Sequence, residues 1–460
     1  MKYHSRKNNK FMTLITLIGS FSMLTSCTLL RPSGNIPEYS TEKEESHEIT
    51  VDTLETEETV HPENFIDDKE IIMDIERPAR AEAVEWIELY NQKYGKDSAD
   101  DIIMEHDSIS EYNQKLIQEC GTLHDMKNPP ESMLGSDVKL EIERYTIPTD
   151  ERNDRHKNRI TAEMREAVRA NCDLDKIPDE VEVRYGIITN RCDLRGFPTE
   201  LGFYDVATGY YSGIQECELI TGFPVIILHE SNDGGFYFVR SYYYCGWISS
   251  SCAALTDREE YISHQSPENF ITILSPEIKV NDTALSMGCT LRYVSEDKEH
   301  YYAEIPYSDE NGKLLYKTSE INKTDACFGY LPYTMKNYYR QAFEYLGTPY
   351  CWGGENGGVD CSGFVCTVFR TFGIYLPRNT GEQEKYNGNV ISFASNNASD
   401  ILDGVKYPTS VHRRGHVMLY LGEKNGLHYI IHAPQGGETI CVTSLSLPGN
   451  LTNVCVIADK

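Results

Sequence analysis

One cysteine stands in a stretch of sequence that favours a reactive thiol. The stretch Gly358–Cys366 reads GVDCSGFVC, with Cys361 between an aspartate and a serine. The apolar residues that follow at helical spacing are Phe364, Val365, Val368, Phe369 and Phe372. This spacing predicts a buried helix with Cys361 on its first turn. Unpaired N–H groups and the helix dipole favour a thiolate at that position, so we expect nucleophilic chemistry.

A nucleophilic thiol needs a base and a group that orients the base. His416 follows Gly415 and opens the strand-like run HVMLYLG, and His432 lies in the next run, HYIIHAP. Adjacent antiparallel strands bring side chains on one face to within roughly 5 Å. We therefore expect His416 to be the base and His432 to hold its imidazole. His412 and His428 are competing candidates, and the alternative for each histidine is a place in the core or on the surface.

The elements that must position these residues are predicted from changes in the hydrophobic pattern and composition along the chain. Residues 63–180 are mainly helical in pattern, as in ARAEAVEWIELYNQKYG. Residues 181–331 consist of short strand-like runs such as VEVRYGIIT and FPVIILHES, broken by Gly, Pro, Asn and Asp. Strands at this spacing predict two small barrels, at 181–262 and 263–331. The last unit, 332–460, begins with a helical segment and ends in alternating strands, so the fold class is α+β.

The N-terminus has the features of an export signal. Four Lys or Arg residues lie within the first ten positions, and the apolar run Phe11–Leu24 follows. The sequence then reads Leu-Thr-Ser before Cys27, which resembles the lipobox of bacterial lipoproteins. We predict that residues 1–26 are a signal peptide and that Cys27 carries lipid. The alternative is a plain signal peptide with a chance cysteine.

Composition and charge narrow the range of partners. Residues 27–62 are rich in Glu, Thr and Ser, which predicts a disordered acidic tether. With a lipid at Cys27, the protein is expected in the cell envelope, anchored at the outer membrane and facing the periplasm. The formal charge of −28 disfavours nucleic acid as a partner. The chain has 14 cysteines and no CxxC pair, so we expect no zinc ribbon, and the sequence leaves disulfide pairing open.

The segment around Cys361 also resembles a known family. The run YLGTPYCWGGENGGVDCSGF resembles the NlpC family of papain-like cell-wall cysteine peptidases, and the resemblance covers about residues 332–460. The motifs that carry it are Tyr350, Trp352-Gly353-Gly354, Asp360-Cys361-Ser362-Gly363, Gly415-His416-Val417 and Ile431-His432-Ala433.

The resemblance implies a role for each of these residues. Cys361 would be the nucleophile, His416 the general base and His432 the third, polar member of the catalytic set. Tyr350 would stabilise the oxyanion together with the Cys361 backbone N–H. Neither a metal nor a cofactor is expected. The implied substrates are peptidoglycan stem peptides or muropeptides, cut between γ-D-glutamate and a diamino acid, usually meso-diaminopimelate.

One motif departs from the family. Where the family often reads Pro-Arg-Asp-Ser, this chain reads Pro-Arg-Asn-Thr, so the acidic residue that helps to bind a substrate amine is missing. Asp360 is then the clearest nearby carboxylate. We expect a preference for stems with a free N-terminal L-alanine, weaker than full charge pairing would give. The residues expected to contact substrate are Trp352, Asp360, Ser362, Asn379 and Thr380.

The upstream chain resembles the modules that accompany this peptidase. YGIITNRCDLRGFPT and FYFVRSYYYCGWI resemble the first of two bacterial SH3-like domains, and NQKLIQECGTLHDM resembles a helical N-terminal segment. The resemblance therefore implies a papain-like domain preceded by two SH3-like barrels. Two other functions stay open: a wall-binding scaffold with an inactive peptidase domain, and a related Cys-His amidase or acyltransferase. Product analysis on purified muropeptides separates the three.

Overall fold

The computed structural model describes residues 78–393, 398–436, 438–446 and 450–458. All of them belong to one contact unit, His61–Lys460. The predicted signal segment, Cys27 and the predicted tether lie outside the described residues. Among the helices within these ranges, none is both long and apolar enough to cross a membrane.

The helices of the predicted N-terminal domain, 63–180, do not share a core of their own. The elements are α1 (Ala81–Tyr94), η2 (Ser98–Asp100), α2 (His106–Glu119), β1 (Ser132–Leu134), α3 (Gly135–Glu143), β2 (Arg152–Asn153), α4 (Ala162–Asn171) and η3 (Leu174–Lys176). Trp86 of α1 joins the large core that also contains the nucleophile helix. Val138 of α3 and Val168 of α4 join a second core, around Trp247. The described helices are therefore divided between two neighbouring units.

Residues 181–262, here called the first β-domain, form an antiparallel sheet of seven strands in the order β11-β4-β8-β9-β10-β5-β7. The elements are β3 (Glu180–Glu182), β4 (Arg184–Ile188), β5 (Cys192–Arg195), β6 (Tyr204–Asp205), β7 (Gln215–Leu219), β8 (Pro224–Glu230), β9 (Phe236–Arg240), β10 (Cys245–Ser249), η4 (Ser250–Cys252), β11 (Ala253–Thr256) and α5 (Arg258–His264). The predicted strands are present. Strand β7 ends the order, and it contacts the loop before the nucleophile.

Residues 263–331, here called the second β-domain, form a five-stranded sheet in the order β17-β16-β15-β12-β18 and a separate hairpin, β13-β14. The strands are β12 (Phe270–Ile273), β13 (Glu277–Val280), β14 (Thr283–Ser286), β15 (Thr290–Glu296), β16 (His300–Ser308), β17 (Leu314–Asn322) and β18 (Ala326–Phe328). An antiparallel sheet thus occupies the expected range. That it is a second SH3-like domain stays a prediction.

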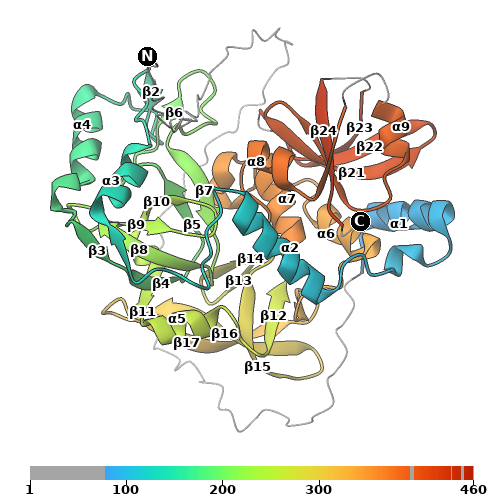
Figure 1. The fold of residues 1–460 in the computed structure, drawn as a ribbon, viewed down its shortest axis with the longest axis horizontal. Helices are drawn as coiled ribbons and strands as arrows, with labels where there is room; N and C mark the ends of the chain where they lie inside the picture. The colour runs from blue at the N-terminus through green and yellow to red at the C-terminus, as the bar shows by residue number, and fades with distance from the viewer. Residues whose placement is uncertain (1–77, 394–397, 437, 447–449, 459–460) are drawn as a thin grey trace, which may run out of the picture. The chain divides into compact units, whose positions relative to one another are not determined.

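The C-terminal part pairs a group of helices with a six-stranded sheet in the order β19-β24-β20-β21-β22-β23. The elements are α6 (Met335–Glu344), η5 (Trp352–Gly357), α7 (Cys361–Arg370), α8 (Thr380–Tyr386), β19 (Asn389–Ser392), α9 (Ala398–Asp403), β20 (Thr409–Arg413), β21 (His416–Lys424), β22 (Leu427–His432), β23 (Cys441–Ser444) and β24 (Leu451–Val456). In Figure 1, α6, α7 and α8 (orange) lie beside this sheet (red), and α7 contacts β21. The contact joins the predicted nucleophile to the predicted base.

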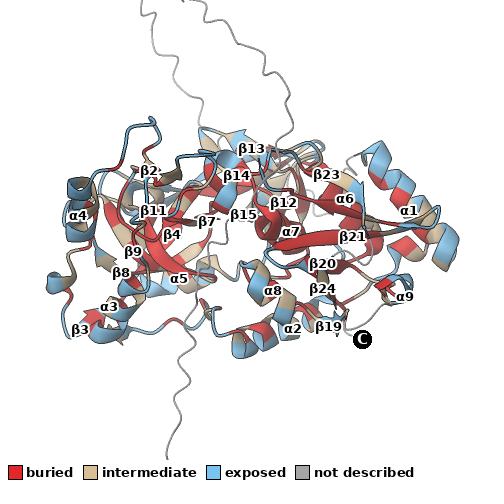
Figure 2. Ribbon diagram, turned by 90° about the horizontal axis from the view of Figure 1, so that it is seen from above, coloured by how far each residue is buried: buried red, intermediate tan, exposed pale blue. Residues whose placement is uncertain are grey.

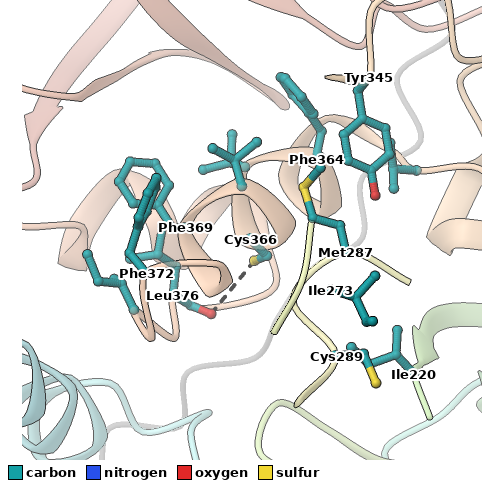
Figure 3. Packing of buried hydrophobic residues seen from close by; sticks show 14 of the residues in the cluster. Ile220, Ile273, Met287, Cys289, Tyr345, Phe364, Cys366, Phe369, Phe372 and Leu376 are labelled. Carbon is teal, nitrogen blue, oxygen red and sulfur yellow. Dashed lines mark hydrogen bonds between the residues drawn. The ribbon is translucent and has the colours of Figure 1, made fainter. Parts of the chain in front are cut away.

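Helix α7 is enclosed on every side. Each of its residues is buried, and Figure 2 shows it red between elements with exposed faces. Phe364 lies beside Met287 of the second β-domain, and Figure 3 shows their side chains together. On the next turns, the Cys366 thiol donates to the Leu376 carbonyl at 3.7 Å. Dense packing of this kind holds the helix in one position, and with it the residue at its start.

Candidate active site

The predicted nucleophile occupies the first position of α7. Asp360 precedes it with extended backbone, and its Oδ1 accepts a hydrogen bond from the Gly363 N–H at 2.7 Å. This is the bond of an N-cap aspartate, which satisfies one of the unpaired N–H groups of the first turn. The helix predicted from the apolar spacing is therefore confirmed, and its start places Cys361 where the chain turns from strand to helix.

The environment of the thiol differs from the sequence-based expectation. Cys361 is only 4% exposed, and its Sγ lies 3.8 Å from the Thr380 Oγ1. Burial raises the pKa of Cys361, and the Asp360 carboxylate raises it further, whereas the Val417 N–H, Thr380 and Arg378 lower it. The net pKa lies above that of an ordinary cysteine. Burial therefore disfavours the thiolate that the position at the start of the helix was expected to favour.

The two predicted histidines meet at the end of a strand pair. His416 is the first residue of β21 and His432 the last of β22. These strands are antiparallel, with Leu419 opposite Ile431, which sets His432 diagonally across from His416. His416 Nε2 lies 2.9 Å from His432 Nδ1, and His432 Nε2 lies 3.2 Å from the Thr443 Oγ1. The predicted strand pair is confirmed, and it brings both imidazoles together.

Both imidazoles are neutral at neutral pH. Burial lowers the pKa of His416 to about 3, helped by the repulsion that two charged imidazoles, His416 and His432, would have and by the positive charge of Arg413. Burial and Arg413 lower the pKa of His432 to about 4. His416 Nδ1 is buried and has no hydrogen-bond partner among the described residues. The N–H of Val417, the residue after His416, lowers the pKa of Cys361 by hydrogen bonding to its sulfur, which places the thiol next to the first residues of β21.

The competing histidines have other partners. His412 Nε2 lies 2.9 Å from the Ser410 Oγ, and His428 Nδ1 lies 2.8 Å from the Tyr420 hydroxyl. In the part of the chain that the structure describes, His, Cys, Asp and Glu side chains do not gather in groups of three suited to a metal ion. The structure therefore brings His416 and His432 together and pairs His412 and His428 with other residues.

Tyr350 lies just before η5 with its hydroxyl buried. Within the described ranges that hydroxyl has no hydrogen-bond partner. Burial raises the pKa of Tyr350, and the charges of Asp360 and Cys361 raise it further. The phenol is therefore a protonated donor near the thiol, and the described residues offer no acceptor for its hydrogen.

Asp360 has a different task from the predicted contact with a substrate amine. Its Oδ1 and Oδ2 accept hydrogen bonds from Arg378 at 2.9 and 2.8 Å, and Oδ2 also accepts one from the Gly353 N–H at 3.0 Å. The Ser362 hydroxyl, 3.2 Å from Oδ1, is held by the same group. Although burial raises the pKa of Asp360, Arg378 brings it below its ordinary value. Both oxygens are occupied, so this carboxylate is not free to bind an ammonium group.

The other predicted substrate contacts lie where the first β-domain meets the site. Trp352, 37% exposed, donates from Nε1 to the Gln215 carbonyl at 3.3 Å, and its ring makes an edge contact with Tyr211. The Asn379 Oδ1 accepts a hydrogen bond from the Tyr244 hydroxyl at 2.6 Å. That these residues, with Thr380, bind substrate stays a prediction. Their neighbours show that the first β-domain borders the site.

The sequence analysis missed an acidic residue at this border. Glu216, on β7, is partly buried, and among the described residues its carboxylate has no hydrogen-bond or ion-pair partner. Burial raises the pKa of Glu216 to about 7, against the charges of Arg144 and Arg378. The carboxylate also raises the pKa of Tyr244, the hydroxyl that binds Asn379. No local pattern signals this residue, because it lies on a strand far upstream of Cys361.

A cysteine at the start of a buried helix that packs on a strand of an antiparallel sheet, with a histidine at the start of that strand, defines a papain-like site. Residues 347–452 match the NlpC/P60 family, and residues 210–249 match an SH3 domain of the SH3b1 type. The chain thus contains an NlpC/P60 domain and an SH3 domain, and peptidases of the NlpC/P60 family are cysteine peptidases. The papain-like domain and one SH3-like domain that the resemblance implied are confirmed.

Two named bacterial peptidases are similar to this chain in sequence. A γ-D-glutamyl-L-lysine dipeptidyl-peptidase of Bacillus cereus is 26% identical over 230 residues, 45% of this chain and 61% of that protein. The Bacillus subtilis protein of the same name is 35% identical over 103 residues, 22% of this chain and 33% of its own. The chain thus spans less than two thirds of either relative.

A solved structure shares the fold. An NlpC/P60 endopeptidase from Photobacterium damselae subsp. piscicida superposes with a TM-score of 0.65 and 21% identity, over 84% of this chain and 99% of that one. The similarity therefore extends well beyond the peptidase domain. At this identity it establishes the shared fold.

Proposed function

We propose that this chain is a cysteine endopeptidase of peptidoglycan stem peptides, cleaving between γ-D-glutamate and a diamino acid such as meso-diaminopimelate. The observation that carries the proposal is the buried thiol of Cys361 at the start of α7, next to the His416–His432 pair. Two relatives are named γ-D-glutamyl-L-lysine dipeptidyl-peptidases, which supports the bond type.

The first step in this proposal starts from neutral groups. As the sulfur attacks the carbonyl carbon, His416 takes the thiol proton on Nδ1. The imidazolium then donates from Nε2 to His432 Nδ1, and His432 donates from Nε2 to the Thr443 hydroxyl. His416 next gives the proton to the departing amine. A water molecule, deprotonated by His416, hydrolyses the thioester and restores the thiol.

The negative charge on the tetrahedral intermediate needs hydrogen-bond donors. The Tyr350 hydroxyl and the backbone N–H of Cys361 can supply two, since first-turn N–H groups have no acceptor within the helix. A donor of this kind is often worth ~3 kcal/mol of transition-state stabilisation. The hydroxyl hydrogen of Tyr350, which has no acceptor among the residues that the structure describes, supports this role.

We further propose that the enzyme prefers stems with a free N-terminal L-alanine. Asp360 is bound to Arg378, and Asn379 carries no charge, so neither can pair with the ammonium group. Glu216 can, because its carboxylate is unpaired in the described structure and lies near Tyr244 and Arg378. A charge-assisted hydrogen bond in such a place is worth ~1.5–3 kcal/mol, roughly ten- to a hundredfold in selectivity.

The proposed place of work is the cell envelope, with a lipid anchor on Cys27 at the outer membrane facing the periplasm. The basic segment, the apolar run and the Leu-Thr-Ser-Cys sequence support it. Metabolic labelling with a fatty acid should mark the wild type and not Cys27→Ser. Equal labelling of both would remove the anchor from the proposal.

Product analysis tests the reaction. The purified protein is incubated with L-Ala-γ-D-Glu-meso-diaminopimelate, its N-acetylated form and intact muropeptides, and the products are identified by mass spectrometry. We expect L-Ala-γ-D-Glu and free diaminopimelate from the first peptide, none from Cys361→Ala, and wild-type yield from the control Cys252→Ala. Cleavage between sugar and peptide would indicate an amidase instead. Formation of an acylated acceptor would indicate an acyltransferase. The absence of any product would indicate a wall-binding scaffold.

A further inference from the structure

A charged cluster joins the first β-domain to the start of the nucleophile helix. Arg378 donates from Nη1 and Nη2 to the two oxygens of Asp360, and Nη2 also lies 3.3 Å from the Oε2 of Glu218. Asp360 belongs to the peptidase domain, whereas Glu218 belongs to β7. One guanidinium group is therefore held by carboxylates from two parts of the chain.

All three side chains are removed from water. Glu218, Asp360 and Arg378 are 8%, 7% and 5% exposed. Burying charges is costly unless they are paired with good geometry, and breaking such a pair strongly destabilises the group that is left. Two carboxylates around one guanidinium leave one uncompensated negative charge close to the thiol. Such an arrangement constrains Arg378 from both sides.

The cluster leads directly to the first turn of α7. The Asp360 oxygen that accepts from Arg378 Nη1 also caps the helix at Gly363, at 2.7 Å. Its other oxygen holds the Gly353 N–H of η5, the segment that follows Tyr350. A displacement of Arg378 therefore displaces both the nucleophile and the oxyanion donor. Among the ion pairs that Arg378 forms in the described structure, only the one with Glu218 reaches the first β-domain.

The fit between β7 and η5 leaves no spare room for another arrangement. Gly354 has a φ of +77°, and a Cβ added there would lie 2.1 Å from the Glu218 Oε2. Next to it, the Gln215 Nε2 donates to the Gly353 carbonyl at 3.1 Å. The carboxylate of Glu218 thus enters a space that only glycine leaves open.

We propose that Glu218 is a positioning residue for Cys361, acting through Arg378 and the cap of α7. The inference deepens the proposed function, on which its catalytic part rests. The first β-domain then supplies part of the internal support of the active site. It does so without touching the reacting atoms.

The test compares Glu218→Ala and Glu218→Gln in the full chain. The glutamine keeps an oxygen that accepts from Arg378 and removes the charge, whereas the alanine removes both. Glu230→Ala is the matched control, because Glu230 forms an exposed ion pair with Arg184 on the same β-domain, at 3.5 Å. The readouts are kcat and KM on L-Ala-γ-D-Glu-meso-diaminopimelate, the melting temperature, and the rate of Cys361 alkylation by iodoacetamide from pH 6 to 10.

Glu218→Ala should lower kcat roughly 10- to 100-fold, the range that a displacement of up to about 1 Å produces. Glu218→Gln should restore kcat to near the wild-type value. Both should lower the apparent pKa of alkylation, because a buried negative charge near the thiolate is gone. In an Arg378→Ala background, Glu218→Ala should have little further effect.

Alkylation and kcat of Glu218→Ala equal to those of Glu230→Ala would overturn the inference, even where the melting temperature falls. Should Glu218→Ala not fold, an unchanged alkylation profile in Glu218→Gln would overturn it equally. Alkylation needs no substrate, so the inference is tested even if the peptide is not cleaved. Failure of the proposed function appears separately, as hydrolysis that survives Cys361→Ala or as no hydrolysis by the wild type.

Discussion

The two β-domains support the same helix by different means. The first one brings polar and charged groups to its N-terminal end, among them Gln215, Glu216 and Glu218 of β7. The second one places Met287 and Ile273 among the apolar side chains of the same core, beside Phe364 (Figure 3). One domain borders the chemistry, and the other fills the space behind it.

One residue links the two kinds of support. Arg191 of the first β-domain donates to the carbonyls of Gly354 and Gly358, at 3.0 and 2.6 Å, and pairs with Glu277 of the second β-domain at 3.3 Å. Through Arg191, the second β-domain is linked by an ion pair to the carbonyls of the loop before the nucleophile. Two consecutive domains with similar strand patterns can therefore have separate tasks, which depend on the edge that faces the peptidase domain.

The largest expected effect tests whether the first β-domain borders a catalytic site at all. Cys361→Ala should lower kcat by roughly 10⁶-fold, the scale seen when a nucleophile is removed. The melting temperature should change by no more than about 4 °C, since the loss of one small group costs ~1 kcal/mol. Hydrolysis assays and thermal unfolding check this. Retained hydrolysis would leave the charged groups of β7 without the chemistry assigned to them.

The second β-domain should affect stability and not chemistry. Met287→Ala removes a fully buried side chain and should cost ~2–5 kcal/mol of unfolding free energy. Met287→Leu keeps the volume and should cost less than about 1.5 kcal/mol. Denaturant unfolding gives both values. A shift in the pH profile of Cys361 alkylation in folded Met287→Leu would contradict the separation of the two tasks.

Glu216 should show the opposite behaviour. Glu216→Gln should lower kcat/KM for the free tripeptide by roughly ten- to a hundredfold, because the ammonium group loses a charged partner. The N-acetylated peptide should be cut at an unchanged rate, and the unfolding free energy should not fall. Glu230→Gln serves as the surface control. An equal loss on both peptides would assign Glu216 to structure instead of selectivity.

Acid should loosen the contact between the two β-domains. His264 lies between them, with Nε2 at 2.8 Å from the Gly222 carbonyl and Nδ1 at 3.0 Å from the Tyr316 hydroxyl. Burial lowers the pKa of His264 to about 4, below the ~6.5 of a histidine in the unfolded chain. Between pH 4 and pH 6.5 the unfolded chain therefore binds more protons at this residue than the folded chain does. Its stabilising contribution is complete above pH 6.5 and is lost as the pH falls toward 4.

Unfolding by denaturant at several pH values measures this loss, which should reach up to about 1.4 kcal/mol per pH unit for one histidine. His264→Gln should flatten the slope between pH 6.5 and 4. Other buried histidines, such as His412, contribute in the same direction and remain in the variant. An unchanged slope would mean that this contact does not sense acid.

The smallest expected effect concerns the thiol. Alkylation of Cys361 should show an apparent pKa above the ~8.5 of free cysteine, because burial and Asp360 disfavour the thiolate. Rates with iodoacetamide between pH 6 and 10 check this, with the chain unfolded in denaturant as the reference. An apparent pKa below that of the unfolded chain would contradict this prediction and would support the thiolate that the position at the helix N-terminus alone predicts.

Local patterns carried much of the fold and the centre of the site. The apolar positions from Phe364 to Phe372 predicted α7, and alternation after His416 predicted β21 and β22. Such periodicities indicate which face of an element is buried, so they can be recognised without knowing how the rest of the chain folds. They did not predict that the helices of residues 63–180 would be divided between two cores, because an amphipathic face does not say which partner covers it.

Local patterns were enough to predict Cys361, His416 and His432 as the nucleophile, the base and its partner, because each lies at the end of an element with its own periodicity. The tertiary structure alone decided what surrounds them. In the folded chain, Asp360 pairs with Arg378, and Glu216 and Glu218 lie at the site on a strand of another domain. Burial there raises the pKa of Cys361. The reason is physical: the energy of a charge depends on every group and on all the water within several ångströms, and distant segments supply or exclude these only when the chain folds.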